Sequence, residues 1–145
     1  MLYGTSAKNL KKLQNLIIQN TLARVVTGVN RREHIQPALK KLHWLPVKER
    51  IEYKVALITH KVISSKQPRY LTDIVNIHRP ARDLRSASQQ HLSGHITKTK
   101  AAERSFSCAS KIVWNQLPFH LRTEGSTRTF KFKLKTTLFK YAYCM

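Results

Sequence analysis

The sequence predicts a mainly α-helical protein of four to five helices, with an irregular basic segment in the middle that leaves room for a small β-hairpin. Apolar residues recur at spacings of three and four along most of the chain, the period of an amphipathic helix. Only 4 Gly and 5 Pro interrupt the 145 residues, and 41% of the residues are hydrophobic. A chain of this length and composition can bury a core without disulfides or metals.

The first predicted helix covers roughly 20 residues, and Gly28 lies where a glycine commonly ends a helix. Its apolar residues occur on most sides of the helix and include Leu13, Leu22, Val25 and Val26. Such a helix is usually buried on more than one side. We therefore expect it to pack against a larger body or to leave an apolar face bare.

Two further helices follow a polar break at residues 30–34. The first covers Ile35–Leu42, with Pro37 in its first turn, where the missing N–H costs little. The second begins after Pro46 and ends near Ser64 and Ser65. It has the clearest apolar stripe of the chain, because its apolar residues follow one another at three or four positions. One or two helical turns are expected between Pro68 and Val75.

The composition changes at residues 76–100, which are basic and polar. We expect a loop with two short strands, around Leu84–Ser88 and His95–Thr99. A helix over Ala102–Leu117 should end at Pro118, and Ser126 with Thr127 should begin the last helix. On that helix, one face carries Phe130, Leu134, Leu138 and Tyr141, and the other carries Phe132, Phe139 and Tyr143. The chain thus divides into segments 1–28, 29–78, 79–100 and 101–145.

The charge of the chain is strongly positive and evenly spread. The net charge is +20, of which residues 1–78 and residues 79–145 each contribute +10. A folded body with this balance repels itself and favours a polyanionic partner. Nucleic acid fits best, since closely spaced phosphates reward many Lys and Arg contacts. A basic surface without specific role, an anionic membrane surface and an acidic protein are the alternatives.

Several classes of protein are excluded by simple counts. Cys108 and Cys144 cannot form a disulfide framework, and no run of about 18 apolar residues could span a membrane. The N-terminus lacks the basic and apolar regions of a signal peptide. The expected location is intracellular, nuclear or cytoplasmic, rather than secreted.

Groups for catalysis or metal binding are sparse. Asp73 and Asp83 are ten residues apart and form no pair for a two-metal site. Glu49 and Glu52 are better explained as exposed charges of a helix. His43 is expected to pack against a neighbouring aromatic ring, and Cys108 to be a packed thiol. We therefore predict no enzyme activity, no metal and no cofactor.

A set of ordered segments resembles a known family. The two most specific are Leu42–Val47, which reads Leu-His-Trp-Leu-Pro-Val, and Trp114–Pro118, which reads Trp-Asn-Gln-Leu-Pro. The order of the segments along the chain also matches, and the further ones are Arg24–Gly28, Arg32–Ile35, Pro80–Arg82, Leu84–Ser86, Arg104–Phe106 and Thr129–Lys131. The resemblance covers essentially the whole chain. The string resembles the C-terminal region, after the polymerase core, of reverse transcriptases from non-LTR retrotransposons of the jockey-like and related animal clades.

The resemblance implies a non-catalytic fragment that contacts template RNA or target DNA. The adjacent aspartates of the polymerase have no counterpart here, so no catalytic residue is carried over. By this resemblance, residues 1–28 correspond to the thumb-proximal helix, and the chain looks like a truncated or relic copy. The alternative is a helical scaffold or protein-interaction remnant with no nucleic-acid role, which could self-associate or pack on a polymerase domain.

Three groups of cations are the candidate nucleic-acid-binding residues. The first is Arg79, Arg82 and Arg85, whose regular spacing around Pro80 suits phosphate contacts. The second is Lys131, Lys133 and Lys135, followed by Lys140 and interleaved with Phe132 and Phe139 as candidate stacking partners for bases. The third is Arg31 and Arg32, together with Lys40 and Lys41. Trp44 and Trp114 are expected to be core anchors.

Overall fold

The computed structural model describes residues 2–16, 18–78, 82, 89–94 and 97–144. Helices dominate this part of the chain, and two short strands form a single antiparallel pair, which confirms the mainly α fold. In chain order the elements are α1 (Ala7–Leu16), α2 (Ile18–Thr27), α3 (Gln36–Lys41), α4 (Val47–Ser65), α5 (Arg69–Thr72), β1 (Asn76–Ile77), β2 (Leu92–Ser93), α6 (Lys100–Glu103), α7 (Phe106–Gln116), α8 (Phe119–Arg122) and α9 (Thr127–Tyr143).

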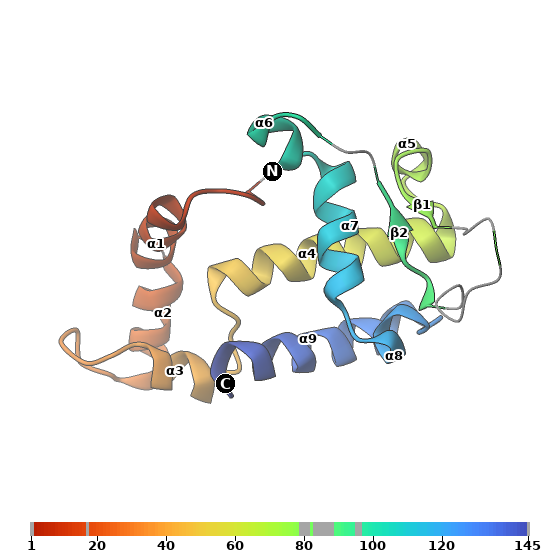
Figure 1. The fold of residues 1–145 in the computed structure, drawn as a ribbon. Coiled ribbons are helices and arrows are strands. Elements are labelled where there is room, and N and C mark those ends of the chain that lie inside the picture. The colour runs from red at the N-terminus through yellow and green to blue at the C-terminus, as the bar shows by residue number, and fades with distance from the viewer. Residues whose placement is uncertain (1, 17, 79–81, 83–88, 95–96, 145) are drawn as a thin grey trace.

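The core lies where α4 meets α7 and α9. In Figure 1, α7 crosses α4, and α9 runs back beneath α4 in the opposite direction. The apolar stripes predicted for these helices face one another, because each helix alone would expose its stripe to water. The buried side chains include Val55, Ala56 and Val62 of α4, Ala109, Val113 and Trp114 of α7, and Phe130, Leu134 and Leu138 of α9.

His60 joins the three helices at the centre of this core. Its ring stacks on Phe130, with 4.1 Å between the ring centroids and 17° between the planes. Its Nε2 donates to the carbonyl oxygen of Glu124 at 2.8 Å. Trp114 packs beside both rings and donates its indole N–H to the carbonyl of Gln90 at 2.9 Å. His60 is thus a buried core residue that fastens the turn before α9 to α4.

The boundaries of α3, α4, α5 and α9 lie within one or two residues of the predicted ones. Gly28 has a φ of +70° and donates its N–H to the carbonyl of Arg24 at 2.8 Å, which confirms its role just past the end of α2. Pro118 ends α7 as predicted and lies at the N-cap position of α8.

One helix that was predicted as continuous is divided. The helix predicted over Ala102–Leu117 is α6 and α7. Ser105 is extended there (φ −62°, ψ 156°), so the chain restarts a helix at Phe106. The backbone angles of a single residue therefore outweigh the apolar period. Between α1 and α2, Ile17 lies outside the described residues, and the side-chain amide of Asn20 donates to the carbonyl of Gln14 at 2.7 Å.

The strand pair exists, but its strands are not the predicted ones. β1 and β2 pair Asn76 with Ser93 and Ile77 with Leu92, and they flank the basic segment. Leu84–Ser88 lies outside the described residues, and Thr97–Thr99 belongs to no strand. The side-chain amide of Asn115 on α7 fixes the position of β2, because it accepts from the N–H of Leu92 at 2.9 Å and donates to its carbonyl at 3.2 Å. A long-range contact of this kind leaves no pattern in the local sequence.

Within the described ranges, no helix is both long enough and apolar enough to cross a lipid bilayer.

Candidate nucleic-acid interface

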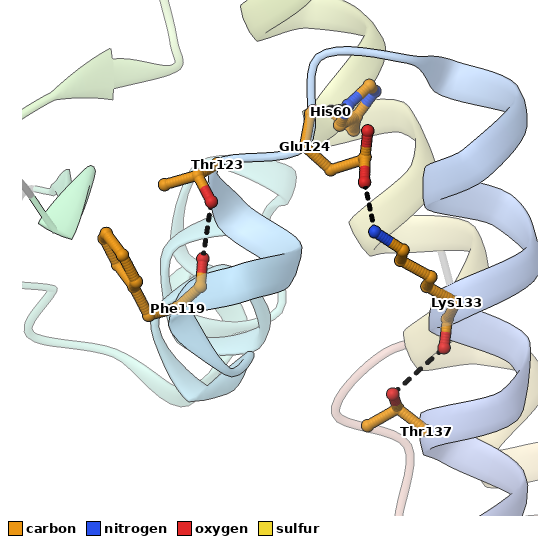
Figure 2. A network of polar contacts seen from close by, with 6 residues as sticks. All are labelled: His60, Phe119, Thr123, Glu124, Lys133 and Thr137. Carbon is orange, nitrogen blue, oxygen red and sulfur yellow. Dashed lines mark hydrogen bonds and ion pairs between the residues drawn. The ribbon is translucent and has the colours of Figure 1, made fainter.

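The cations of this chain have few acidic partners. All but Arg79 and Arg85 of the 27 Lys and Arg residues are described, and within this set a single ion pair is found, between Lys133 and Glu124 at 2.6 Å. Figure 2 shows this pair beside His60, at the start of α9. The hydrogen bond from Lys133 is the main reason why the pKa of Glu124 lies below its usual value. The other described cations face solvent or contact backbone carbonyls and uncharged side chains.

The first predicted group, Arg79, Arg82 and Arg85, is only partly visible. Arg79 and Arg85 lie outside the described residues. Arg82 is exposed. The assignment of phosphate contacts to this group therefore stays a prediction.

The group around Arg31 and Arg32 lies in the turn between α2 and α3. Both arginines are exposed, and Arg31 lines an open hollow of about 940 Å³ together with Arg24 and His34. Arg24 stabilises this turn, because its guanidinium donates hydrogen bonds to the carbonyls of Asn30 and Glu33, the latter at 2.8 Å. Lys40 and Lys41 follow on the last turn of α3 and are exposed as well.

The first three lysines of α9 do not share one face. Lys131 and Lys135 are four residues apart and point to the same side of the helix, and both are exposed. Lys133 is two residues from each and therefore points about half a turn away, toward Glu124. Phe132 is 74% exposed, whereas Phe139 stacks on His43 at 5.2 Å between ring centroids. Only Phe132 of these two is thus open to a stacking partner.

A second hollow, of about 550 Å³, is lined by residues of α2, the α3–α4 turn, α4 and α9, whose backbone arrangement Figure 1 shows. Its lining combines three aromatic rings, two apolar side chains, one amide and two cations, and includes no Asp or Glu. The residues are Gln19, Leu22, His43, Trp44, Leu45, Arg50, Tyr53 and Lys135. We call this hollow the basic aromatic pocket.

The turn that carries His43 and Trp44 is held by its own backbone hydrogen bonds and by side chains from α2 and α9. The N–H of Trp44 donates to the carbonyl of Leu39 at 2.9 Å, and the N–H of His43 to that of Lys40 at 3.1 Å, which is a Schellman end for α3. Gln19 of α2 donates to the carbonyl of Leu45 at 2.9 Å. From the other side, the hydroxyl of Tyr143 donates to the carbonyl of Trp44 at 2.7 Å.

Sequence reasoning missed this pocket. His43 does pack on an aromatic ring, as predicted, and Trp114 is a core anchor with 1% of its surface exposed. The prediction of a core anchor is wrong for Trp44, which is half-buried and lines the pocket. The three-residue spacing of Arg50 and Tyr53 on α4 places them on one face, but no sequence signal brings Lys135, 85 residues later, beside them.

One arginine is part of the core and not of any surface. Arg122 is buried, and its burial lowers the pKa of its guanidinium. Its Nη1 donates to Nδ1 of His91 at 2.8 Å, and Nε2 of His91 lies 2.8 Å from the side-chain oxygen of Gln89. Arg122 and His91 therefore fasten α8 to the segment before β2.

The described residues contain no group of three His, Cys, Asp or Glu side chains close enough to hold a metal ion. Burial raises the pKa of Glu52, Lys48 acts against this rise, and Glu49 adds to it. Cys108 is half-buried on α7.

Comparison of the chain with models of protein families, with curated proteins and with solved structures finds no match.

Proposed function

We propose that this chain binds nucleic acid through its phosphate groups and carries out no chemistry of its own. The observation that carries the proposal is the charge of the described surface: many Lys and Arg side chains against a single ion pair. Uncompensated cations on a folded body favour a partner with closely spaced negative charges. The resemblance to the C-terminal region of non-LTR retrotransposon reverse transcriptases leads to the same expectation.

Phosphate contacts of this kind position a strand without reading its sequence. The exposed cations Arg31, Arg32, Lys131 and Lys135 come from separate elements, so the interface is expected to follow a backbone and not a short sequence motif. Arg82, with Arg79 and Arg85, would extend it.

The test is the salt dependence of binding to a labelled RNA or DNA oligonucleotide of arbitrary sequence. The logarithm of the affinity should fall linearly with the logarithm of the salt concentration, with a slope of about −0.7 per phosphate neutralised on a single strand. With about three or more phosphates, the affinity should drop at least about tenfold between about 50 and 200 mM salt. Polyglutamate of similar length is the control for binding to any polyanion. Absent binding at the lowest salt, or equal binding to polyglutamate, would reject the proposal.

An apolar face supports the alternative, a scaffold or protein-interaction module. On α2, Leu22, Val25 and Val26 expose 47%, 74% and 59% of their surfaces, as expected for a helix that is apolar on most sides. This alternative requires self-association or capture by a protein through α2. Sedimentation velocity distinguishes the two functions: a monomer that binds oligonucleotides favours the first, and a dimer without such binding favours the second.

A further inference from the structure

The basic aromatic pocket is concave, partly apolar and open to solvent. Gln19 and Leu45 are buried and form its floor, whereas His43, Arg50 and Lys135 are exposed and lie toward its mouth. Leu22, Trp44 and Tyr53 complete the lining. A volume of about 550 Å³ is typical of sites that enclose a small molecule or one unit of a polymer.

The two cations of the pocket come from different helices and line the same hollow. Arg50 belongs to α4 and Lys135 to α9. Among the described residues, the guanidinium of Arg50 has one long hydrogen bond, from Nη1 to the side-chain oxygen of Gln19 at 3.5 Å. Most of its donors thus remain for a ligand, and no acidic side chain of the lining competes for them.

The lining as a whole limits the class of ligand. A free phosphate needs only the cations and gains nothing from Trp44, Tyr53 and Leu22. An apolar ligand would contact only the aromatic rings and Leu22, and it would form no interaction with the two cations. A planar, partly apolar ring joined to a phosphate uses both, because bases stack on aromatic side chains and phosphates accept from Arg and Lys.

We propose that the basic aromatic pocket takes one unpaired base of single-stranded RNA or DNA, with the adjoining phosphates on Arg50 and Lys135. The inference rests on the proposed function and makes it more specific, since it adds a preference for single strands. A base inside a duplex is held in its stack and cannot enter. The stacking partner is Trp44 or Tyr53, the two large aromatic side chains that line the pocket.

Tryptophan fluorescence gives a direct readout. The chain has two Trp residues, and Trp114 is fully buried, so quenching by an added strand reports on Trp44. The unmodified protein is titrated with oligothymidylate, with oligouridylate, with an abasic strand of the same length and charge, and with a duplex. Oligothymidylate or oligouridylate should quench the emission and bind about 5- to 100-fold more tightly than the abasic strand. The duplex, like the abasic strand, should leave the emission of Trp44 unquenched.

Two variants on α2 form a matched pair. Leu22→Glu places a carboxylate in the pocket, and Val25→Glu adds the same charge three residues later, outside its lining. Both side chains are well exposed, so both variants should fold, which far-UV circular dichroism verifies. Leu22→Glu should abolish the preference for thymidylate over the abasic strand, and Val25→Glu should retain it.

The outcomes separate this inference from the proposed function. If no strand binds at low salt, both fail. If thymidylate, uridylate and abasic strands bind equally and without quenching, the phosphate interface stands and the base pocket is refuted. The base pocket is also refuted if Val25→Glu removes the preference as completely as Leu22→Glu does. The comparison of uridylate with thymidylate shows whether the pocket favours RNA or DNA.

Discussion

His43 has an unusual backbone conformation and also lines the basic aromatic pocket. It occupies the position just past the end of α3, with a φ of +53°. Glycine is the usual residue there, because an L side chain in this region costs on the order of 1 kcal/mol. The stacking of its ring on Phe139 offsets part of this cost, and the turn at His43 places Trp44 in the lining of the pocket. The protein thus accepts a strained residue where α3, α9 and the basic aromatic pocket meet.

Two substitutions at this position separate the backbone from the ring. His43→Ala loses the stacked ring and keeps the strain, whereas His43→Gly loses the ring and relieves the strain. We expect the alanine variant to be less stable than the glycine variant by about 1 kcal/mol in urea unfolding. Gly28→Ala is the control, because Gly28 has the same conformation and no atom within 4 Å of an added Cβ. Equal stability of the two His43 variants would contradict the strain.

At the scale of elements, α9 carries its charges on two sides. Its buried face, Phe130, Leu134 and Leu138, packs into the core. Lys131 and Lys135 lie to one side of this face, and Lys133 and Lys140 lie to the other. Lys133 is already paired with Glu124, whereas Lys135 lines the pocket. The two sides are therefore chemically different although their charge is equal.

Double variants of α9 test this difference. Lys131→Gln with Lys135→Gln should lower the magnitude of the salt slope for a single-stranded oligonucleotide by about 1.4, about 0.7 for each lost phosphate contact. Lys133→Gln with Lys140→Gln removes the same charge from the other side and should leave the slope nearly unchanged. The slopes are measured by fluorescence anisotropy at several salt concentrations. Identical slopes for both double variants would mean that α9 acts only through its net charge.

At the scale of the whole molecule, Tyr143 fastens the last turn of α9 to the α3–α4 turn. The hydrogen bond from its hydroxyl to the carbonyl of Trp44 spans 99 residues of sequence. Burial, followed by the nearby charge of Glu49, raises the pKa of Tyr143 to about 12. The folded state thus holds the phenol in its protonated form, and the bond joins two of the segments that line the pocket.

This pKa predicts how stability changes in alkali. An ordinary tyrosine in the unfolded chain has a pKa of 10.0, so the contribution of Tyr143 is complete below pH 10 and is lost as the pH rises toward 12. Tyr143→Phe should cost about 1 kcal/mol at pH 7, from the lost hydrogen bond. Its free energy of unfolding should then decline less between pH 10 and 12 than that of the unmodified protein.

The remaining alkaline decline is expected from Tyr3 and Tyr53, whose pKa values are also raised by burial. Tyr141→Phe is the matched control, on the same helix and with half of its side chain exposed. It should leave the stability at pH 7 nearly unchanged. An unaltered alkaline decline in Tyr143→Phe would show that this phenol does not couple the two segments to pH.

The sequence by itself determined the mainly α fold, the position of α3, α4 and α9, and the end of α2 at Gly28. These features depend on neighbours within a few residues, through apolar spacing, proline and glycine, so a local pattern records them. The same holds for the total charge and for the apolar face of α2, which the structure leaves exposed.

Only the tertiary structure decided which cations line a common pocket and which are already paired with other side chains of the protein. Ser105 divides a helix that the apolar period predicts as continuous, and Asn115 fixes where the short strands pair. Arg50 and Lys135 line one pocket only because α4 and α9 pack antiparallel. Contacts between residues so far apart in the chain are set by packing free energy, which no short stretch of sequence encodes.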